Sequence, residues 1–374
     1  MMREFRRRSA ERFCIRAICE NVIAGVVNSM NRMLVRCALL SVALLPCAAS
    51  AEPIKLNLSF FTSDRSTIYL AAAKPFVDAV NAEAKDLLEI EVSFSVGKQP
   101  EQAQLVLDDA FDLAFIVPGL TPQQFPDNTI IEMPGLFRNM REATLVYTQL
   151  IAANRLSGYE NLAVIGAFAN EPESIHTRKP VASLDDLKGM KIRANNPTEA
   201  AALEKLGMVP VALPVNMISE AIASGKIDGT AVPPSPLEEF GIGRVVANHY
   251  FLLVASAPMA LVMNRTKFES LPGRAQDIIR KYSGLWAAAR YLETYEPVEA
   301  QVMARLKADP RRKLVAPSRL DNDRAEDAYQ SIIADWKAQS PHNSELLTTV
   351  KSDLAKLRST VALPAANPSR SETR

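Results

Sequence analysis

Arg193 is the residue of this sequence whose type and position best suit a chemical task. It directly follows the apolar run 190–192 in the stretch 183–229, where short apolar runs alternate with segments of helical period. We interpret that stretch as strand, helix, strand, helix and strand, with Arg193 where the first strand ends. Because ligands of open α/β sheets bind beyond the carboxyl ends of strands, a guanidinium at this place can grip an anionic group.

Three further polar side chains are candidates for the same site. Asn195 and Asn216 follow predicted strands and could donate amide hydrogens to a ligand, although turns and helix caps use asparagine equally well. His176 lies in a short predicted strand, 174–177, that we expect to return toward the same crevice. A histidine satisfied within the core is an equally good interpretation of His176.

The sequence lacks the motifs of common catalytic sites. It has no G-x-S-x-G elbow, no Walker loop, no H-E-x-x-H and no histidine pair at metal-ligand spacing. We therefore expect a protein that is not an enzyme and that has no cofactor and no built metal site. Whether a metal ion assists ligand binding stays open.

The charge of the chain is unevenly placed. The full sequence has a net charge of +1, but its first 51 residues contain eight arginines and three glutamates, so 35 basic and 39 acidic residues remain, a net of −4. A mildly acidic remainder gives no electrostatic reason to expect nucleic-acid binding.

Residues 33–51 have the pattern of a secretory signal peptide, with a basic start, a short apolar core and the sequence Ala-Ser-Ala at the end. The apolar run is too short to span a bilayer comfortably. We expect export and cleavage before Glu52, while the true start stays open between the methionines at 1, 30 and 33. All cysteines precede the cleavage point, so the exported chain would carry no thiol; they are Cys14, Cys19, Cys37 and Cys47.

The elements that position Arg193 belong to an α/β fold. Strands are predicted at 54–60, 88–96 and 111–116, with helical periodicity over 68–88 and 99–110. This order implies a mostly parallel sheet whose loops 61–67 and 117–120 face a ligand crevice.

We expect two lobes. Lobe I takes in residues 52–170 and 258–297, lobe II takes in 171–257 with 298–360 packed behind it, and 361–374 form a disordered tail. One helix predicted from 272 to about 308, kinked at Pro297, is long enough to brace both lobes. The proline-rich segment 121–136 is expected to be extended.

Four sequences, FDLAF, EMPGLF, SLDDLKGMKIR and VALPVNMISEAIASGKIDG, resemble in this order the solute-binding proteins of tripartite ATP-independent periplasmic (TRAP) transporters, the DctP-type family. The resemblance covers about residues 54–350. It implies two α/β lobes joined by crossing strands, a long helix behind both, and a carboxylate held by Arg193 in the cleft between the lobes. It also implies a periplasmic, monomeric protein that delivers an organic acid to membrane permease subunits.

Two departures from the family pattern bear on the ligand. Glu173 stands where some members have a second arginine, and Ala231-Val232-Pro233 replaces a Glu-Asn-Pro sequence of many members. A sialic-acid-like or strongly dicarboxylate-specific pocket is therefore not expected. A less polar monocarboxylate, such as a keto acid or an aromatic acid, suits the apolar residues predicted to line the cleft, which are Phe61, Val117, Phe137 and Val232.

Two other functions stay open. A periplasmic ligand sensor would present its closed form to a signalling receptor, and a secreted enzyme on this fold would turn the acid over. Neighbouring genes for two membrane proteins would favour transport, a neighbouring histidine kinase would favour sensing, and turnover of an acid would reveal an enzyme.

Overall fold

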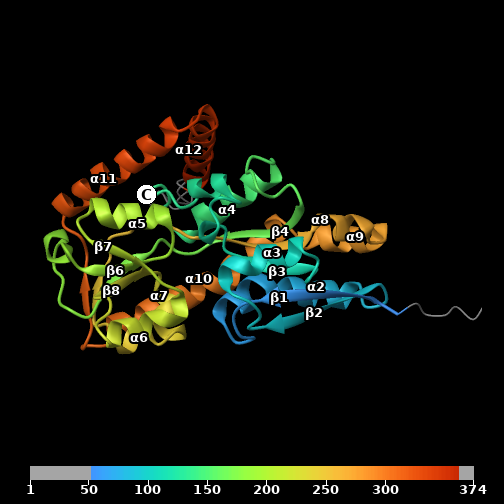
Figure 1. The fold of residues 1–374 in the computed structure, drawn as a ribbon, viewed down its shortest axis with the longest axis horizontal. Helices are drawn as coiled ribbons and strands as arrows, with labels where there is room; N and C mark the ends of the chain where they lie inside the picture. Colours follow the sequence, from blue (N-terminus) through green and yellow to red (C-terminus); the bar gives the residue numbers. More distant parts are fainter. Residues whose placement is uncertain (1–51, 362–374) are drawn as a thin grey trace, which may run out of the picture. The chain divides into compact units, whose positions relative to one another are not determined.

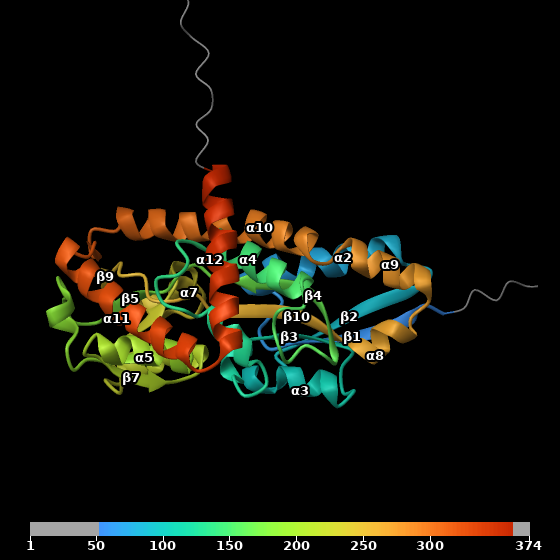
Figure 2. The same ribbon diagram turned by 90° about the horizontal axis from the view of Figure 1, so that it is seen from above.

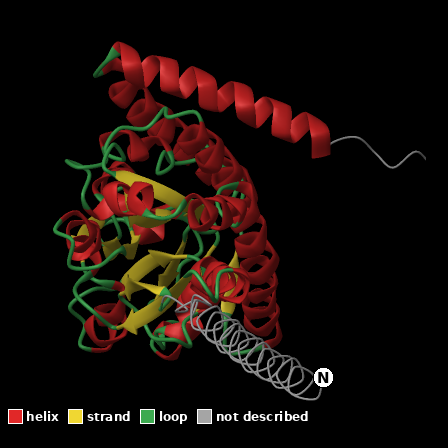
Figure 3. Ribbon diagram, turned by 90° about the vertical axis from the view of Figure 1, so that its right-hand side faces the viewer, coloured by secondary structure: helices red, strands yellow, loops and turns green. Residues whose placement is uncertain are grey.

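The computed structural model describes residues 52–361 (Figure 1). The predicted signal peptide 33–51, the residues before it and the predicted tail from 362 onward lie outside the described residues. Figure 3 shows the strands in the interior with helices around them, which is the layered arrangement of an α/β fold.

The first sheet has five strands in the order β2-β1-β3-β10-β4. Strand β1 pairs in parallel with β2 and β3, whereas β10 runs antiparallel to β3 and β4. The strands are β1 Ile54–Phe60, β2 Leu88–Phe94, β3 Leu113–Ile116, β4 Leu162–Ala169 and β10 Pro258–Asn264.

The second sheet has six strands in the order β11-β9-β5-β8-β6-β7. Strand β6 lies in parallel between β7 and β8, and β5 is antiparallel to both β8 and β9. The strands are β5 Ser174–Thr177, β6 Lys191–Ala194, β7 Val209–Ala212, β8 Gly229–Val232, β9 Asn248–Tyr250 and β11 Lys313–Val315.

Two chain segments cross between the sheets and are bonded to each other. Residues 170–173 lead from β4 to β5, and residues 251–257 lead from β9 to β10. The Glu173 N–H donates to the Ala255 carbonyl at 2.8 Å, and the Val254 N–H donates to the Glu173 carbonyl at 2.9 Å. The predicted fold class, two α/β lobes joined by crossing strands, is confirmed.

Helices pack against both sheets (Figure 1). They are α2 Lys74–Glu83, α3 Gln102–Leu107, α4 Met140–Ala152, α5 Pro197–Lys205, α6 Ile218–Ala223, α7 Pro234–Glu239, α8 Arg265–Ser270, α9 Gly273–Lys281, α10 Leu285–Ala308, α11 Arg319–Ala338 and α12 Pro341–Val361.

The single helix predicted from 272 to about 308 is wrong in one respect. It is two helices, α9 and α10, separated by a break at Gly284, whose φ of 60° lies outside the helical region. The bracing role is nonetheless as expected, because α10 runs past both sheets (Figure 2). Its Tyr291 hydroxyl donates to the Ala169 carbonyl at the end of β4, and its Glu299 accepts from Ser235 of α7.

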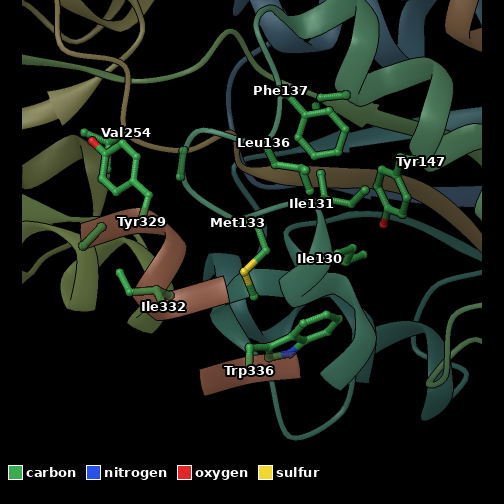
Figure 4. Close-up of a cluster of buried hydrophobic side chains, with 14 of the residues drawn as sticks. Ile130, Ile131, Met133, Leu136, Phe137, Tyr147, Val254, Tyr329, Ile332 and Trp336 are labelled. Carbon is green, nitrogen blue, oxygen red and sulfur yellow. The ribbon is translucent and has the colours of Figure 1, made fainter. Parts of the chain in front are cut away.

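The proline-rich segment 121–136 is not extended as predicted. It contains the 3₁₀ turn Pro126–Ile130, and most of the residues after it are buried. Figure 4 shows Ile131, Met133 and Phe137 among aromatic side chains that include Tyr329 and Trp336 of α11. Proline fixes φ near the value of helical turns as well as extended chain, so its frequency did not distinguish the two.

Candidate functional site

Two adjoining cavities lie where Arg193 was expected to act. One has a volume of about 100 Å³ and the other about 760 Å³, and both are lined by Phe61, Arg193 and Asn195. Many of the lining residues lie at or just after the carboxyl ends of β1, β3, β6 and β8 or belong to the crossing segments. We call the two cavities together the cleft. Its place matches the rule that ligands of α/β sheets bind beyond the strand ends.

Arg193 is fixed by its neighbours in the second sheet. It is 4% exposed. Its Nε–H donates to the Leu213 carbonyl at 3.0 Å, and its Nη2 donates to the Asn195 Oδ1 at 2.9 Å. A third contact, from Nη1 to the Ala231 carbonyl, is long at 3.5 Å.

The Arg193 guanidinium has N–H donors that its protein contacts do not use. A guanidinium carries five N–H groups, and the three contacts above use three of them. In residues 52–361 no carboxylate oxygen lies within 4.0 Å of its nitrogens. The carboxyl groups of Glu173 and Glu199 interact with its charge from farther away. An anionic ligand in the cleft would supply the direct partner that the guanidinium lacks.

Asn195 supports this arrangement from the start of the next helix. Its Oδ1 accepts from Arg193, which leaves the two N–H donors of the amide for other partners, and Asn195 lines both cavities. The cap of α5 is the following residue, Asn196, whose Oδ1 accepts the Glu199 N–H at 2.8 Å. The cap role and the candidate ligand role therefore belong to two successive asparagines.

The apolar candidates divide between cleft and core. Phe61, Val117 and Val232 line the smaller cavity. Phe137 does not line the cleft and is corrected here, because it is 5% exposed and packs in the core cluster of Figure 4. Asn216 is exposed and lines only the larger cavity.

The structure also places His176 outside the cleft, in the second sheet. It is completely buried opposite His249 in the β5–β9 pairing, with the two Nδ1 atoms 2.8 Å apart. Its Nε2 contacts the Val232 carbonyl at 3.1 Å. Burial lowers the pKa of His176 to about 3 and that of His249 to about 4, so both rings are neutral near pH 7.

Glu173, which departs from the family pattern, is also a polar residue of the cleft. It is 3% exposed, lines the smaller cavity, and accepts from Asn170 Nδ2 at 3.1 Å. Burial raises its pKa, and the side chain of Glu199 and the charge of Arg193 lower it. Its place directly before β5 was predictable, but its position on the same cavity as Arg193 was not.

Glu199 is the partner that stabilises the buried carboxyl group of Glu173. Burial and the adjacent Glu173 raise the pKa of Glu199 well above its usual range. Two carboxyl groups can form a hydrogen bond only when one of them carries a proton, and these shifts assign that proton to Glu199. Glu173 then accepts in that hydrogen bond.

Across the cleft, Thr67 and Glu239 form a contact between the loop after β1 and helix α7. The Thr67 N–H donates to Glu239 Oε2 at 3.3 Å. No local sequence pattern marked either residue, because the contact joins positions 172 residues apart.

Two findings apply to residues 52–361. No group of three or more histidine, cysteine, aspartate and glutamate side chains in that range could hold a metal ion. No helix in that range combines the length and apolar character needed to cross a membrane.

The family model for bacterial extracellular solute-binding proteins, family 7 (DctP), matches residues 58–339. The C4-dicarboxylate-binding periplasmic protein DctP of Rhodobacter capsulatus is 25% identical over 245 residues, 62% of this chain and 72% of that protein. A solute-binding protein of Verminephrobacter eiseniae (strain EF01-2) is 24% identical over 235 residues, 61% of this chain and 69% of that protein.

A solved structure is similar over most of the chain. It is a marine metagenome TRAP solute-binding protein specific for aromatic acid ligands, in complex with metahydroxyphenylacetate. Its TM-score is 0.74 at 25% sequence identity, and the match covers 81% of this chain and 99% of that one.

Proposed function

The chain belongs to the DctP family of TRAP solute-binding proteins, and on that premise we propose that it captures an organic monocarboxylate at Arg193. Proteins of this family bind small molecules and deliver them to a membrane permease. The finer part of the proposal is the chemical class of the ligand and the residues that hold it.

One observation carries the proposal. Arg193 is a buried cation on the wall of the cleft, with N–H groups to spare and no carboxylate of the described chain within 4.0 Å. A ligand carboxylate would pair with the Arg193 guanidinium through two parallel N–H···O bonds, with the Asn195 amide beside it.

The rest of the lining supports an acid of low polarity. Phe61, Val117 and Val232 contribute apolar surface to the smaller cavity, and Phe240 lies in both cavities. Apolar walls with a few polar groups are typical of sites for small organic ligands. The similar metagenome protein is specific for aromatic acids, which is consistent with an aromatic or keto acid here.

Substitution of Arg193 tests the proposal. We expect Arg193→Ala to raise the Kd for any bound acid at least about 100-fold, since truncating one partner of a buried charge pair costs several kcal/mol. Arg193→Lys should also bind at least about tenfold more weakly, because an ammonium cannot reproduce the planar fork. The ligand is first found by thermal shift with the chain from Glu52 against keto, aromatic, dicarboxylic and sugar acids, and Kd is then measured by calorimetry.

Arg244→Ala is the matched control, because Arg244 is exposed, lies in the same lobe and is absent from the cleft lining. It should bind like the wild type. Wild-type affinity in Arg193→Ala would refute the assignment of the site. Recovery of the acid unchanged after long incubation is expected of a carrier, and conversion would indicate an enzyme.

Export and cleavage before Glu52 are part of the same proposal. The family is periplasmic, and the pattern of residues 33–51 supports a signal peptide in this chain. Amino-terminal sequencing of the protein recovered from the periplasm should begin at Glu52.

A further inference from the structure

A carboxylate side chain lies in the same small chamber as the proposed carboxylate-binding arginine. The charged residues lining the cavity of about 100 Å³ are Glu173, Arg193 and Glu239. A second carboxylate on the ligand would meet two carboxylates of the protein there. This balance favours a ligand with a single acidic group.

The backbone holds Glu173 firmly at that wall. Its N–H and its carbonyl both bond to the opposite crossing segment, at 2.8 Å to Ala255 and 2.9 Å to Val254. Asn170, which donates to the Glu173 side chain, itself accepts the Ala257 N–H at 2.6 Å. Glu173 is therefore positioned by the same segments that join the two lobes.

Glu173 has acceptor capacity that the described chain does not fill. A carboxylate offers about four lone-pair positions. One position, on Oε1, is used by Asn170. Oε2 is a buried atom that shares a proton with Glu199, so the second lone pair of Oε1 remains for a ligand in the cavity that Glu173 lines. Leaving such capacity unused in a buried site is costly, so a donor supplied by a ligand would stabilise it.

We propose that Glu173 is a second ligand-binding group of the cleft and selects acids that carry an N–H or O–H donor close to the carboxylate. Arg193 takes the carboxylate, and Glu173 accepts the hydroxyl or ammonium hydrogen of the same molecule. This inference rests on the proposed function and names the class of acid within it: 2-hydroxy and 2-amino acids in preference to plain acids.

Matched acids test the inference on the wild-type chain. Phenylacetate, mandelate and phenylglycine share one skeleton and carry hydrogen, hydroxyl and ammonium at carbon 2. Isovalerate, 2-hydroxyisovalerate and valine repeat the comparison on a smaller skeleton. We expect at least one donor-bearing acid to bind about tenfold or more tightly than its plain counterpart, because a site built to bond a donor rejects the analogue that lacks it.

Substitution then assigns the preference to Glu173. In Glu173→Gln the ratio between the donor-bearing and the plain acid should fall below about threefold, while the plain acid keeps its affinity or gains some. Glu204→Gln, an exposed position on α5 outside the cleft, should keep the wild-type ratio. Thermal unfolding checks that the variants fold. If Glu173→Gln does not fold, the comparison of plain and donor-bearing acids on the wild-type chain still tests the proposal.

The two proposals fail in different ways. Equal binding of plain and donor-bearing acids by the wild type, or a ratio unchanged in Glu173→Gln, overturns the role of Glu173 and leaves carboxylate capture intact. Binding that survives Arg193→Ala overturns the proposed function. If no acid of either series binds the wild type, the role of Glu173 is overturned, and the proposed function is decided by the other acids of the thermal-shift screen.

Discussion

Glu132 places a third carboxyl group in the interior near the cleft. It is 2% exposed, and its Oε2 accepts from Thr198 at 3.2 Å. Its Oε1 has no hydrogen-bond partner in the described chain and lies so close to Gly119 that a Cβ there would come within 1.8 Å of it. Burial raises the pKa of Glu132 to about 8, so the folded protein holds it neutral at pH 7.

The sign of its effect on stability follows from proton counts. Between pH 4.5 and about 8 the folded state keeps the Glu132 proton and the unfolded state loses it, so the free energy of unfolding falls as the pH rises. The loss is at most about 1.4 kcal/mol per pH unit for one proton. Glu132→Gln has no proton to lose, and should therefore gain stability relative to the wild type from pH 5 to pH 8. Urea unfolding at both pH values measures the difference, and parallel curves would contradict the prediction.

Single residues differ in how far the sequence could place them. Arg193 was predictable because a short apolar run marked its strand and a strand end marks a binding crevice. Whether His176 and Phe137 face the cleft or the core was not predictable, because that depends on packing partners far away in the chain. For His176 that partner is His249, and Phe137 belongs to a core cluster that also includes residues of α11.

At the scale of elements, strands β5 and β9 are joined by the His176–His249 pair. The short Nδ1···Nδ1 contact requires one ring to donate and the other to accept. If His176 Nε2 donates to the Val232 carbonyl, then His249 donates at Nδ1 and its buried, unpartnered Nε2 bears no hydrogen. Both rings are then neutral, in agreement with their lowered pKa values.

Acid should therefore weaken the second sheet through this pair. Below pH 6.5 both histidines are protonated in the unfolded state, whereas in the folded state they stay neutral down to about pH 4. The free energy of unfolding therefore falls as the pH drops through this window. His249→Asn removes one of these groups. The substitution should lower the free energy of unfolding at pH 7 by about 1–2 kcal/mol because the contact is lost. Between pH 7 and pH 5 the free energy of unfolding should fall by less in the variant than in the wild type. Urea unfolding at pH 7 and pH 5 tests it, and an equal acid loss in both proteins would refute it.

The break between α9 and α10 shows where periodicity stops being informative. The apolar stripe continues across it, so a sequence pattern predicts one helix, whereas the backbone turns at Gly284 with φ 60° and ψ −123°. Only glycine adopts that conformation without strain. A Cβ at Gly284 would meet no atom within 4 Å, so its cost is conformational alone.

Gly284→Ala should consequently destabilise the fold by about 1–3 kcal/mol. Gly273 at the start of α9 is a matched control, since it has no positive φ and its added Cβ would also meet nothing within 4 Å. Gly273→Ala should change stability by less than about 0.5 kcal/mol. Thermal and urea unfolding compare the two, and equal effects would contradict the role of the backbone at Gly284.

For the whole molecule, we propose that the lobes are 52–170 with 258–297, and 171–257 with 298–360, and that they move about the two crossing segments. The segments 170–173 and 251–257 join the sheets and also carry Asn170 and Glu173 of the cleft. The Thr67–Glu239 contact joins the lobes from the other side of the cleft. A ligand held by Arg193 and by residues of both lobes would favour the arrangement in which all these contacts form together.

Ligand binding should therefore bring the two lobes closer on the cleft side. The sequence from Glu52 onward has no cysteine, so a pair introduced by Asp64→Cys and Glu220→Cys can be labelled specifically. Asp64 is exposed in the loop after β1, and Glu220 is exposed on α6, which directly follows the segment 215–217 that lines the larger cavity. The distance between the labels should shorten by about 2 Å or more when the acid identified by the thermal-shift screen is added. In the same pair carrying Arg193→Ala it should not change, and an unchanged distance in the ligand-saturated parent pair would show that capture needs no movement of the lobes.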